Sequence, residues 1–332
     1  MKKYIALALA LLLAFSLVGC SGNAKVKTGL AVITSISSSK DATADAEGNA
    51  QADSVVVAVT VDASGKIVAC KLDTAQSKVA VTADGKISTP LDTEFKTKQE
   101  LGTDYGMKGA SGIGKEWYEQ ADAFAAYCVG KTVDQIKGIA VNEEGAPADA
   151  ELASSVTMHV TSYIDAVAKA VENAKDLGAK ASDTLGLGVS TSIDKSTEAS
   201  ADAAGNVQFY SNYTATTLDK SGKITSCAID ASQTNIGFDT TGKITTDLAS
   251  EFKTKNELGY DYNMKGVSGI GKEWFEQAES LAQYVTGKTI DQVKGIAVNE
   301  EGAPTDAELT SSVTVQITDM LGVIEKAAVN AK

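Results

Sequence analysis

The sequence contains no arginine, so all thirty of its basic residues are lysine. Acidic residues outnumber them, 43 to 30, and the formal net charge is −13. Binding to nucleic acid needs clustered positive charge against the phosphates, so we expect no nucleic-acid partner. Arginine is also the side chain best shaped to grip a phosphate or carboxylate, so any anion site in this chain has to use lysine and backbone amides.

Long apolar runs are also missing, except at the amino terminus. A short basic start, Met1 to Lys3, precedes an apolar run over residues 4–18. This run is too short to span a bilayer, which takes about 20 apolar residues, but it has the length of a signal-peptide core. The Leu17-Val18-Gly19-Cys20 stretch that follows resembles the lipobox of bacterial lipoproteins. The resemblance implies a signal peptide over 1–19, a lipid on Cys20, a tether over 20–28, and a location on the extracytoplasmic face of the cell membrane.

A repeat fills the remaining sequence. Shifted by 157 residues, the chain aligns with itself without a gap, so that Cys70 falls on Cys227, Trp117 on Trp274 and Pro147 on Pro304. We therefore predict two copies of one domain, over 29–175 and 186–332, joined by a linker over 176–185. Each copy has 147 residues, which is enough to bury its own core. Identity is highest over 94–120, where 22 of 27 positions match.

Histidine and cysteine are too scarce to build a site that both copies share. The single histidine, His159, is replaced by Gln316, and Cys128 is replaced by Val285. No cluster of these residues has metal-ligand spacing, so we expect no metal. The two copies share no histidine for acid–base catalysis, and we expect that the chain is not an enzyme. The sequence leaves two interpretations of Cys70 and Cys128 open: buried thiols, which we favour, and a disulfide in the first copy alone.

Each copy begins with a pattern typical of β-strands. Residues 55–61 and 67–72 form a hairpin around a turn at 63–66. Val57 and Val59 become threonine in the second copy, so the face of the hairpin that they share tolerates polar side chains. We therefore expect Val56, Ala58, Cys70 and Leu72 to share the buried face, because the side chains of a strand alternate.

The later part of each copy is predicted to be mainly helical. Trp117, Ala121, Phe124 and Cys128 form one apolar stripe, and Thr132 with Gln135 resembles a capping box. Pro147 suits the first turn of a helix. Alternation over 156–160 and 313–317 predicts one more strand, with a final helix from Thr161 or Ser162. The fold class is therefore α+β, with a mainly antiparallel sheet and helices packed on one face of it in each copy.

A glycine-rich stretch over 105–117, repeated over 262–274, is the main candidate for chemistry. It fits the P-loop spacing up to Lys115, but Glu116 stands where a P-loop needs Ser or Thr, so we exclude an NTPase. Glycines before a helix start can present free backbone amides to an anion, and tyrosine and tryptophan could stack near it. The alternative is a purely structural loop. The candidate ligand-binding residues are Lys108, Gly109, Ser111, Gly112, Gly114 and Lys115, with Lys265, Gly266, Ser268, Gly269, Gly271 and Lys272 in the second copy.

The order of motifs resembles the FMN-binding domains of extracytoplasmic electron-transfer proteins. In that family a hairpin with a "dGkI" turn comes first, as at 63–67 here, and a Ser-Gly-Ala-Thr motif precedes the last helix. The matching segment reads Ser154-Ser155-Val156-Thr157. The resemblance implies FMN as a possible cofactor and Thr157 and Thr314 as possible attachment points. Here Ser-Val replaces the Gly-Ala of the motif.

These features together predict a lipid-anchored extracytoplasmic protein with two ligand-binding-like domains, for FMN or another small anion. The alternative function is a structural or adhesive surface module with no small ligand. The expected partners are the membrane, through the lipid anchor, and a small anionic ligand.

The lipid anchor can be tested directly. Replacing the lipid-bearing sulfur, Cys20→Ser, should leave the precursor without an acyl chain, because the sulfur is the attachment atom. We expect labelled palmitate to be incorporated by the wild-type chain and not by the variant, and the variant to leave the detergent phase. Equal labelling of both chains would show that Cys20 is not the acceptor.

Overall fold

The computed structural model describes residues 23–331, so the predicted signal peptide and Cys20 lie outside the described residues. The strands of the first half are β1 (Lys27–Ser35), β2 (Gly48–Val61) and β3 (Ile67–Val81). Its helices are α1 (Lys98–Leu101), η1 (Gly102–Tyr105), α2 (Trp117–Cys128), α3 (Val133–Lys137), α4 (Ala150–Ala153) and α5 (Thr161–Glu172). The second half repeats this order with β4 (Thr184–Ser192), β5 (Gly205–Leu218), β6 (Ile224–Phe238), α6 (Lys255–Leu258), η2 (Gly259–Tyr262), α7 (Trp274–Val285), α8 (Ile290–Lys294), α9 (Ala307–Thr310) and α10 (Thr318–Asn330).

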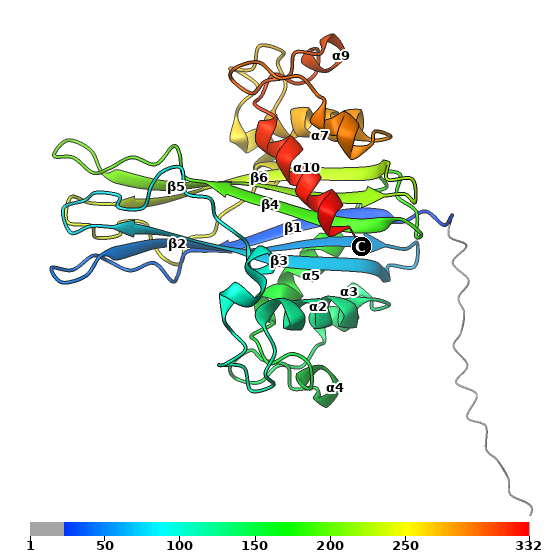
Figure 1. Ribbon diagram of the computed structural model, residues 1–332, viewed down its shortest axis with the longest axis horizontal. Helices are drawn as coiled ribbons and strands as arrows, with labels where there is room; N and C mark the ends of the chain where they lie inside the picture. Colours follow the sequence, from blue (N-terminus) through cyan, green and yellow to red (C-terminus); the bar gives the residue numbers. More distant parts are fainter. Residues whose placement is uncertain (1–22, 332) are drawn as a thin grey trace, which may run out of the picture.

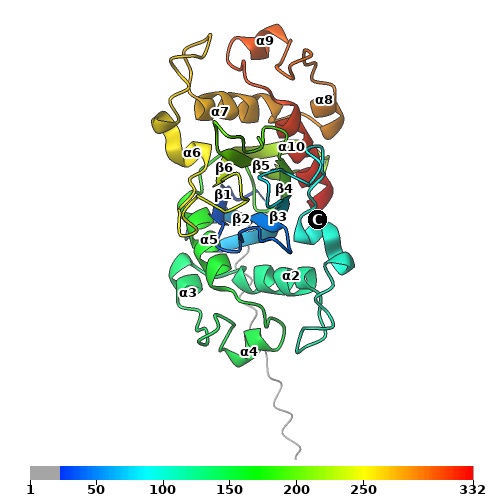
Figure 2. The same ribbon diagram turned by 90° about the vertical axis from the view of Figure 1, so that its left-hand side faces the viewer.

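Each half contains one antiparallel sheet of three strands, in the orders β1-β2-β3 and β4-β5-β6. The two sheets lie face to face in the middle of the molecule, and each half places its helices on the outer face of its own sheet (Figures 1 and 2). The predicted α+β class, with helices on one face of an antiparallel sheet in each copy, is confirmed.

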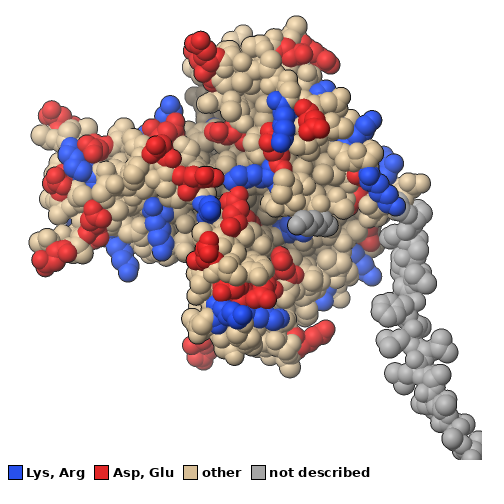
Figure 3. Space-filling view, viewed as in Figure 1, with Lys and Arg blue, Asp and Glu red and all other residues tan. Residues whose placement is uncertain are grey.

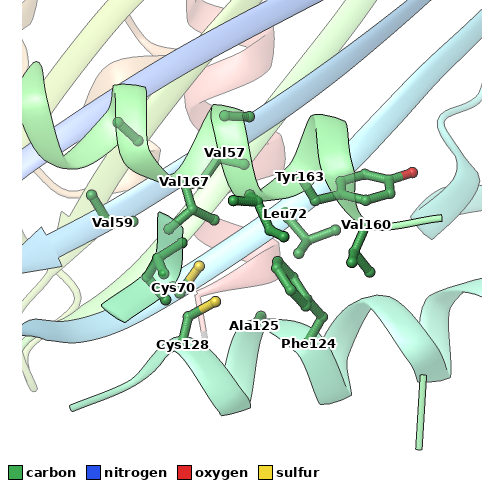
Figure 4. Close-up of a cluster of buried hydrophobic side chains, with 14 of the residues drawn as sticks. Val57, Val59, Cys70, Leu72, Phe124, Ala125, Cys128, Val160, Tyr163 and Val167 are labelled. Atoms are coloured by element: carbon green, nitrogen blue, oxygen red, sulfur yellow. The ribbon is translucent and has the colours of Figure 1, made fainter. Parts of the chain in front are cut away.

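Both faces of each sheet are buried, which changes the predicted assignment of side chains. The strand register pairs Val57 with Leu72 and Val59 with Cys70. These four side chains lie under the helices, in a core that also contains Phe124 (Figure 4). The prediction that Cys70 and Leu72 share a face with Val56 and Ala58 is therefore wrong. It assumed that only one face of the sheet is buried.

The second face of each sheet packs against the other half. Val56 and Ala58 of the first sheet lie in one apolar cluster with Leu187, Tyr213 and Ala215 of the second. A further shared cluster at the hairpin ends joins residues of β2 and β3 to residues of β5 and β6. The two copies therefore have a common interior, a feature that the predicted pair of separate 147-residue domains does not include.

Several local predictions can be compared with the structure. The helix over 117–128 is confirmed, and so is the capping box of Thr132 and Gln135. Pro147 does not begin a helix: it forms an isolated bridge with Val141. The segments 156–160 and 313–317 are not strands. Their alternating apolar residues are buried or half-buried because an irregular segment lies against the core. Burial on one side produces the same pattern as a strand.

Glycine allows the last helix of each half to lie directly on the edge strand. A Cβ atom on Gly29 would stand 1.9 Å from the carbonyl oxygen of Ala170 in α5, and one on Gly186 would stand 1.8 Å from that of Ala327 in α10. The amide of Asn173 then donates to the Leu30 carbonyl at 3.0 Å. The helix thus covers the free edge of β1, which would otherwise expose unpaired carbonyls. Within residues 23–331, no helix combines the length and the apolar character needed to cross a bilayer.

The common interior predicts that the two halves unfold together. Val56 is fully buried between the sheets, so Val56→Asp would place an unpaired charge there and should cost about 3 to 5 kcal/mol of stability. Calorimetry should show one transition that moves to lower temperature as a whole. Ser38→Asp adds the same charge at an exposed position and serves as the control. Two transitions, of which only one moves, would show that the halves fold independently.

Candidate functional site

The glycine-rich loop leads into α2 in the first half and α7 in the second, as the sequence predicts. Its helix start, however, is already occupied by a carboxylate. Glu116 is 5% exposed; it caps the first turn of α2 and accepts a hydrogen bond from the Met107 amide at 2.8 Å. Glu273 does the same in the second half, with the amides of Met264 and Lys265 at 2.8 and 3.1 Å. Amides that the sequence analysis assigned to an external anion therefore bind an internal one.

A buried glutamine joins two of the sequence-predicted sites. Gln120 in α2 donates to the Ser111 hydroxyl of the glycine loop at 3.0 Å. Its carbonyl oxygen accepts from the Thr157 amide at 2.8 Å and from the Met158 amide at 3.1 Å. Gln277 makes the equivalent bonds to Ser268 and Thr314. The signal for this residue was its identity in both copies, but nothing in the sequence indicated that it links the loop to Thr157.

The aromatic rings beside the loop face a lysine of the chain itself. Lys255 is 3% exposed; its ammonium lies 4.7 Å from the Tyr262 ring centre and 5.0 Å from that of Trp274, and it donates to the Tyr210 hydroxyl at 2.7 Å. Burial lowers the pKa of Lys255 to about 7. In the first half, Lys98 lies over the rings of Tyr105 and Trp117. These lysines occupy ring faces on which a ligand was expected to stack.

These contacts decide how well FMN fits the loop. Its phosphate carries two negative charges and would have to displace the Glu116 carboxylate or lie close to it, at a cost in repulsion. Non-covalent FMN therefore does not fit here. Thr157 and Thr314 are exposed, but the backbone amide of each is bonded to glutamine. On the face shown in Figure 3, acidic and basic side chains alternate, and the lysines do not gather into one patch.

A pocket of about 450 Å³ lies between the two halves, where the edge strands β1 and β6 meet. Its apolar wall includes Leu30, Val32, Ile229 and Phe275, and its polar wall includes Lys169, Asp230 and Glu257. Ligand pockets in proteins typically occupy about 300 to 1,000 Å³ and combine apolar walls with a few converging polar groups. Sequence analysis did not identify this site, because its walls come from segments about 200 residues apart.

Lys169 forms the centre of the polar wall. Its ammonium pairs with the Glu257 carboxylate of the other half and donates to the Val32 carbonyl at 2.8 Å. The same contact recurs across the other edge of the sandwich, where Lys326 pairs with Glu100 at 2.7 Å. Both pairs are partly buried and connect a helix of one half to the other half. They hold the two edges of the sandwich together and fix the position of the charges in the pocket.

A buried carboxyl group lies beside each ion pair. Asp230 is 7% exposed and accepts from the amides of Asn256 at 3.1 Å and Ala231 at 2.8 Å. Burial raises the pKa of Asp230 to about 7, opposed by these hydrogen bonds and helped by the charge of Glu257. Asp73 accepts from the equivalent amides of Gln99 and Thr74 in the first half, and burial raises its pKa to about 7. A carboxyl group with such a pKa in a pocket can accept or donate a proton near neutral pH.

The two edges of the sandwich differ in one respect. In the first half, the Gln99 amide reaches Asp122 of α2 at 3.1 Å and so crosses the groove. In the second half the residue is Asn256, one methylene shorter, and its amide donates to the Ile229 carbonyl at 2.8 Å. Glu279, the counterpart of Asp122, then lines the pocket. Gln99 also donates to the equivalent Leu72 carbonyl at 3.3 Å, so the two edges differ here by the one bond from Gln99 to Asp122.

Comparison with known proteins gives one informative result. No family model matches the chain, and no solved structure matches it. A protein of Desulfitobacterium hafniense named chlorophenol reductase is 29% identical over 109 residues, which cover 30% of this chain and 33% of that protein. The match thus spans about a third of the relative. The expectation that this chain is not an enzyme is corrected by this match, because the relative is named as an enzyme.

The raised pKa of Asp73 predicts how stability depends on pH. The folded chain holds this proton up to pH about 7, whereas the unfolded chain releases it above its ordinary pKa of 3.8. The contribution of Asp73 to stability is therefore largest below pH 4 and falls until about pH 7. Asp73→Asn cannot ionise, so its free energy of unfolding relative to the wild type should increase by roughly 2 to 4 kcal/mol between pH 4 and 8. Denaturant titrations at both pH values measure this difference.

Asp219→Asn is the control for this experiment. Hydrogen bonds from the Ser221 hydroxyl and the Lys223 amide lower the pKa of Asp219. Its stabilising contribution is therefore present at pH 8 and lost in acid, which is the opposite sign. The difference in free energy of unfolding between variant and wild type should therefore change in opposite directions with pH for the two variants. A change in the same direction for both would show that Asp73 is ionised in the folded chain.

Proposed function

We propose that the chain is a lipid-anchored extracytoplasmic protein that binds a small phenol in the pocket between its halves and acts in the reduction of that phenol. The observation that carries this proposal is the pocket itself, in which an apolar wall faces Lys169, Glu257 and Asp230. The name of the similar protein, chlorophenol reductase, supports both the ligand class and the type of reaction.

The charge of the pocket favours a neutral hydroxyl over an anion. Four carboxylic side chains line it, against two lysines. A phosphate would be repelled by this surplus, whereas a phenol can donate its hydroxyl hydrogen to a carboxylate and accept from an ammonium group. Its ring would lie against the apolar wall, where Phe275 provides an aromatic partner. We therefore assign a phenol to the pocket, in place of the small anion expected at the glycine loop.

The position of the pocket also suits a substrate that collects in membranes. Thr28 lines the pocket and follows the predicted lipid-bearing Cys20 by eight residues, which span at most about 29 Å. A chlorinated phenol is apolar apart from its hydroxyl, so it partitions toward the bilayer. A pocket held near the membrane surface would meet such a molecule at a raised local concentration.

A reduction also needs an electron carrier. The order of motifs resembles that of FMN-binding electron-transfer proteins, which supports an electron-transfer setting for the chain. The pocket, with its surplus of carboxylates, suits the substrate better than the phosphate of FMN. In this proposal the residues of the pocket bind and orient the phenol, and Asp230 holds or releases a proton near neutral pH.

The pocket can be tested with a matched pair of variants. Phe275→Ala removes an aromatic wall of the pocket, and Tyr118→Ala makes the same truncation at the equivalent position of the first half. Titration calorimetry with 4-chlorophenol should show about tenfold weaker binding for Phe275→Ala and unchanged binding for Tyr118→Ala, because an aromatic contact contributes about 1 kcal/mol beyond its area. If the wild type does not bind 4-chlorophenol, or if both variants lose the same affinity for it, the phenol does not bind in this pocket.

Turnover needs a separate measurement. If the reduction is a dechlorination, the wild-type chain should convert 4-chlorophenol to phenol and chloride, with two electrons from two molecules of one-electron-reduced viologen and one proton from solvent. Phe275→Ala should release chloride more slowly at low substrate concentration. If the chain binds 4-chlorophenol but does not consume it, the proposed ligand stands and the proposed reductive role of the isolated chain is wrong.

A further inference from the structure

Two cysteines of the first half meet in its core. Cys70 lies on β3 and Cys128 is the last residue of α2, and they are 8% and 0% exposed. Both belong to the apolar cluster between the sheet and the helices, and the structure has both as buried free thiols, as the favoured interpretation of the sequence predicts. Figure 4 shows their sulfur atoms turned toward each other across the space between the strand and the helix end.

The second half shows what a solitary cysteine at this position requires. Cys227 has threonine hydroxyls as partners, with Thr214 at 3.5 Å and Thr216 at 3.7 Å, and Val285 stands in the place of Cys128. In the first half, valines replace both threonines. The neighbouring Cys128 thiol, together with burial, raises the pKa of Cys70 well above its ordinary value. Each half thus supplies a polar partner for its cysteine, but only the first half supplies a second thiol.

We propose that Cys70 and Cys128 form a disulfide bond in the exported protein, a cross-link that the second half lacks. The proposal rests on the extracytoplasmic location proposed above, because disulfides persist in oxidising compartments. The bond would join the strand β3 to the carboxyl end of α2.

The bond forms by exchange with the disulfide of an oxidising protein or of a small molecule such as oxidised glutathione. A thiolate of the chain attacks one sulfur of that disulfide and releases one thiol, and the second cysteine then displaces the other. One S–S bond breaks and one forms. Cys70 and Cys128 lose two electrons and two protons in total, and the reagent leaves as two thiols. Because the thiolate is the reactive form and both sulfurs are buried in the folded chain, exchange takes place while the chain folds.

The cross-link would close a loop of 58 residues, from Cys70 to Cys128, which contains α1, η1 and the glycine-rich loop. Closing such a loop restricts the unfolded chain more than the folded one, and so stabilises the folded state. The carboxylate cap of Glu116 fixes one end of α2, and the disulfide would fix the other. The helix that holds Gln120 would then be attached to its surroundings at both ends.

Refolding tests the geometry independently of location. We expect the full chain, reduced, unfolded and refolded in a glutathione buffer, to yield a disulfide-linked pair of peptides after cleavage at lysine, covering 67–71 and 116–131. Cys128→Val is the matched control, since valine occupies this place in the second half; it should form no linked pair and should keep Cys70 and Cys227 as free thiols. Failure of the wild-type chain to form the linked pair would overturn the proposal.

The protein recovered from the membrane fraction tests the exported state. Alkylation after denaturation without reductant should label one thiol, Cys227, and alkylation after reduction should label three. Three labelled thiols before reduction would overturn the proposal, while the fractionation itself shows separately whether the proposed location holds. Reduction should also lower the melting temperature of the wild-type chain by roughly 5 to 10 °C and leave that of Cys128→Val unchanged.

Discussion

The structure depends on contact between two sheets that neither half can cover alone. The helices of each half shield one face of a three-stranded sheet, and the opposite face remains apolar through residues such as Val56 and Ala58. Tyr213 and Ala215 of the other half complete the burial. This single packing requirement explains why the copies occur in tandem, why their edge strands run beside each other, and why ion pairs and a pocket arise at those edges.

Much of the fold could be predicted from one sequence, because local patterns report local structure. The hairpin over 55–72, the helix over 117–128 and the capping box at Thr132 each follow from a period or a short motif. The errors have a common cause. Alternation over 313–317 is interpreted as a strand, and polarity at Thr214 is interpreted as an exposed face. Each interpretation depends on what covers the other side of the segment, which the sequence does not show. In this protein both sides of the sheet are covered, and hydroxyls are buried by pairing with each other and with Cys227.

The candidate site was less predictable, because its parts come from distant segments. The sequence identified the glycine loop and Thr157, but it could not show that Glu116 closes the helix start or that Gln120 connects the two. The pocket unites Lys169 with Glu257, which no motif relates. The repeat contained one usable hint, since the pair recurs as Lys326 and Glu100; pairs of charges preserved in both copies are candidates for contacts between them.

The hydrogen bond between Gln99 and Asp122 makes the two duplicated halves unlike at the edges of the sandwich. It joins α1 to α2 in the first half, whereas the shorter Asn256 donates to the Ile229 carbonyl of its own sheet. The Glu279 carboxylate, the counterpart of Asp122, lines the pocket instead. A duplicated backbone thus carries two edges with different side-chain chemistry, and the difference comes from the length of one amide side chain.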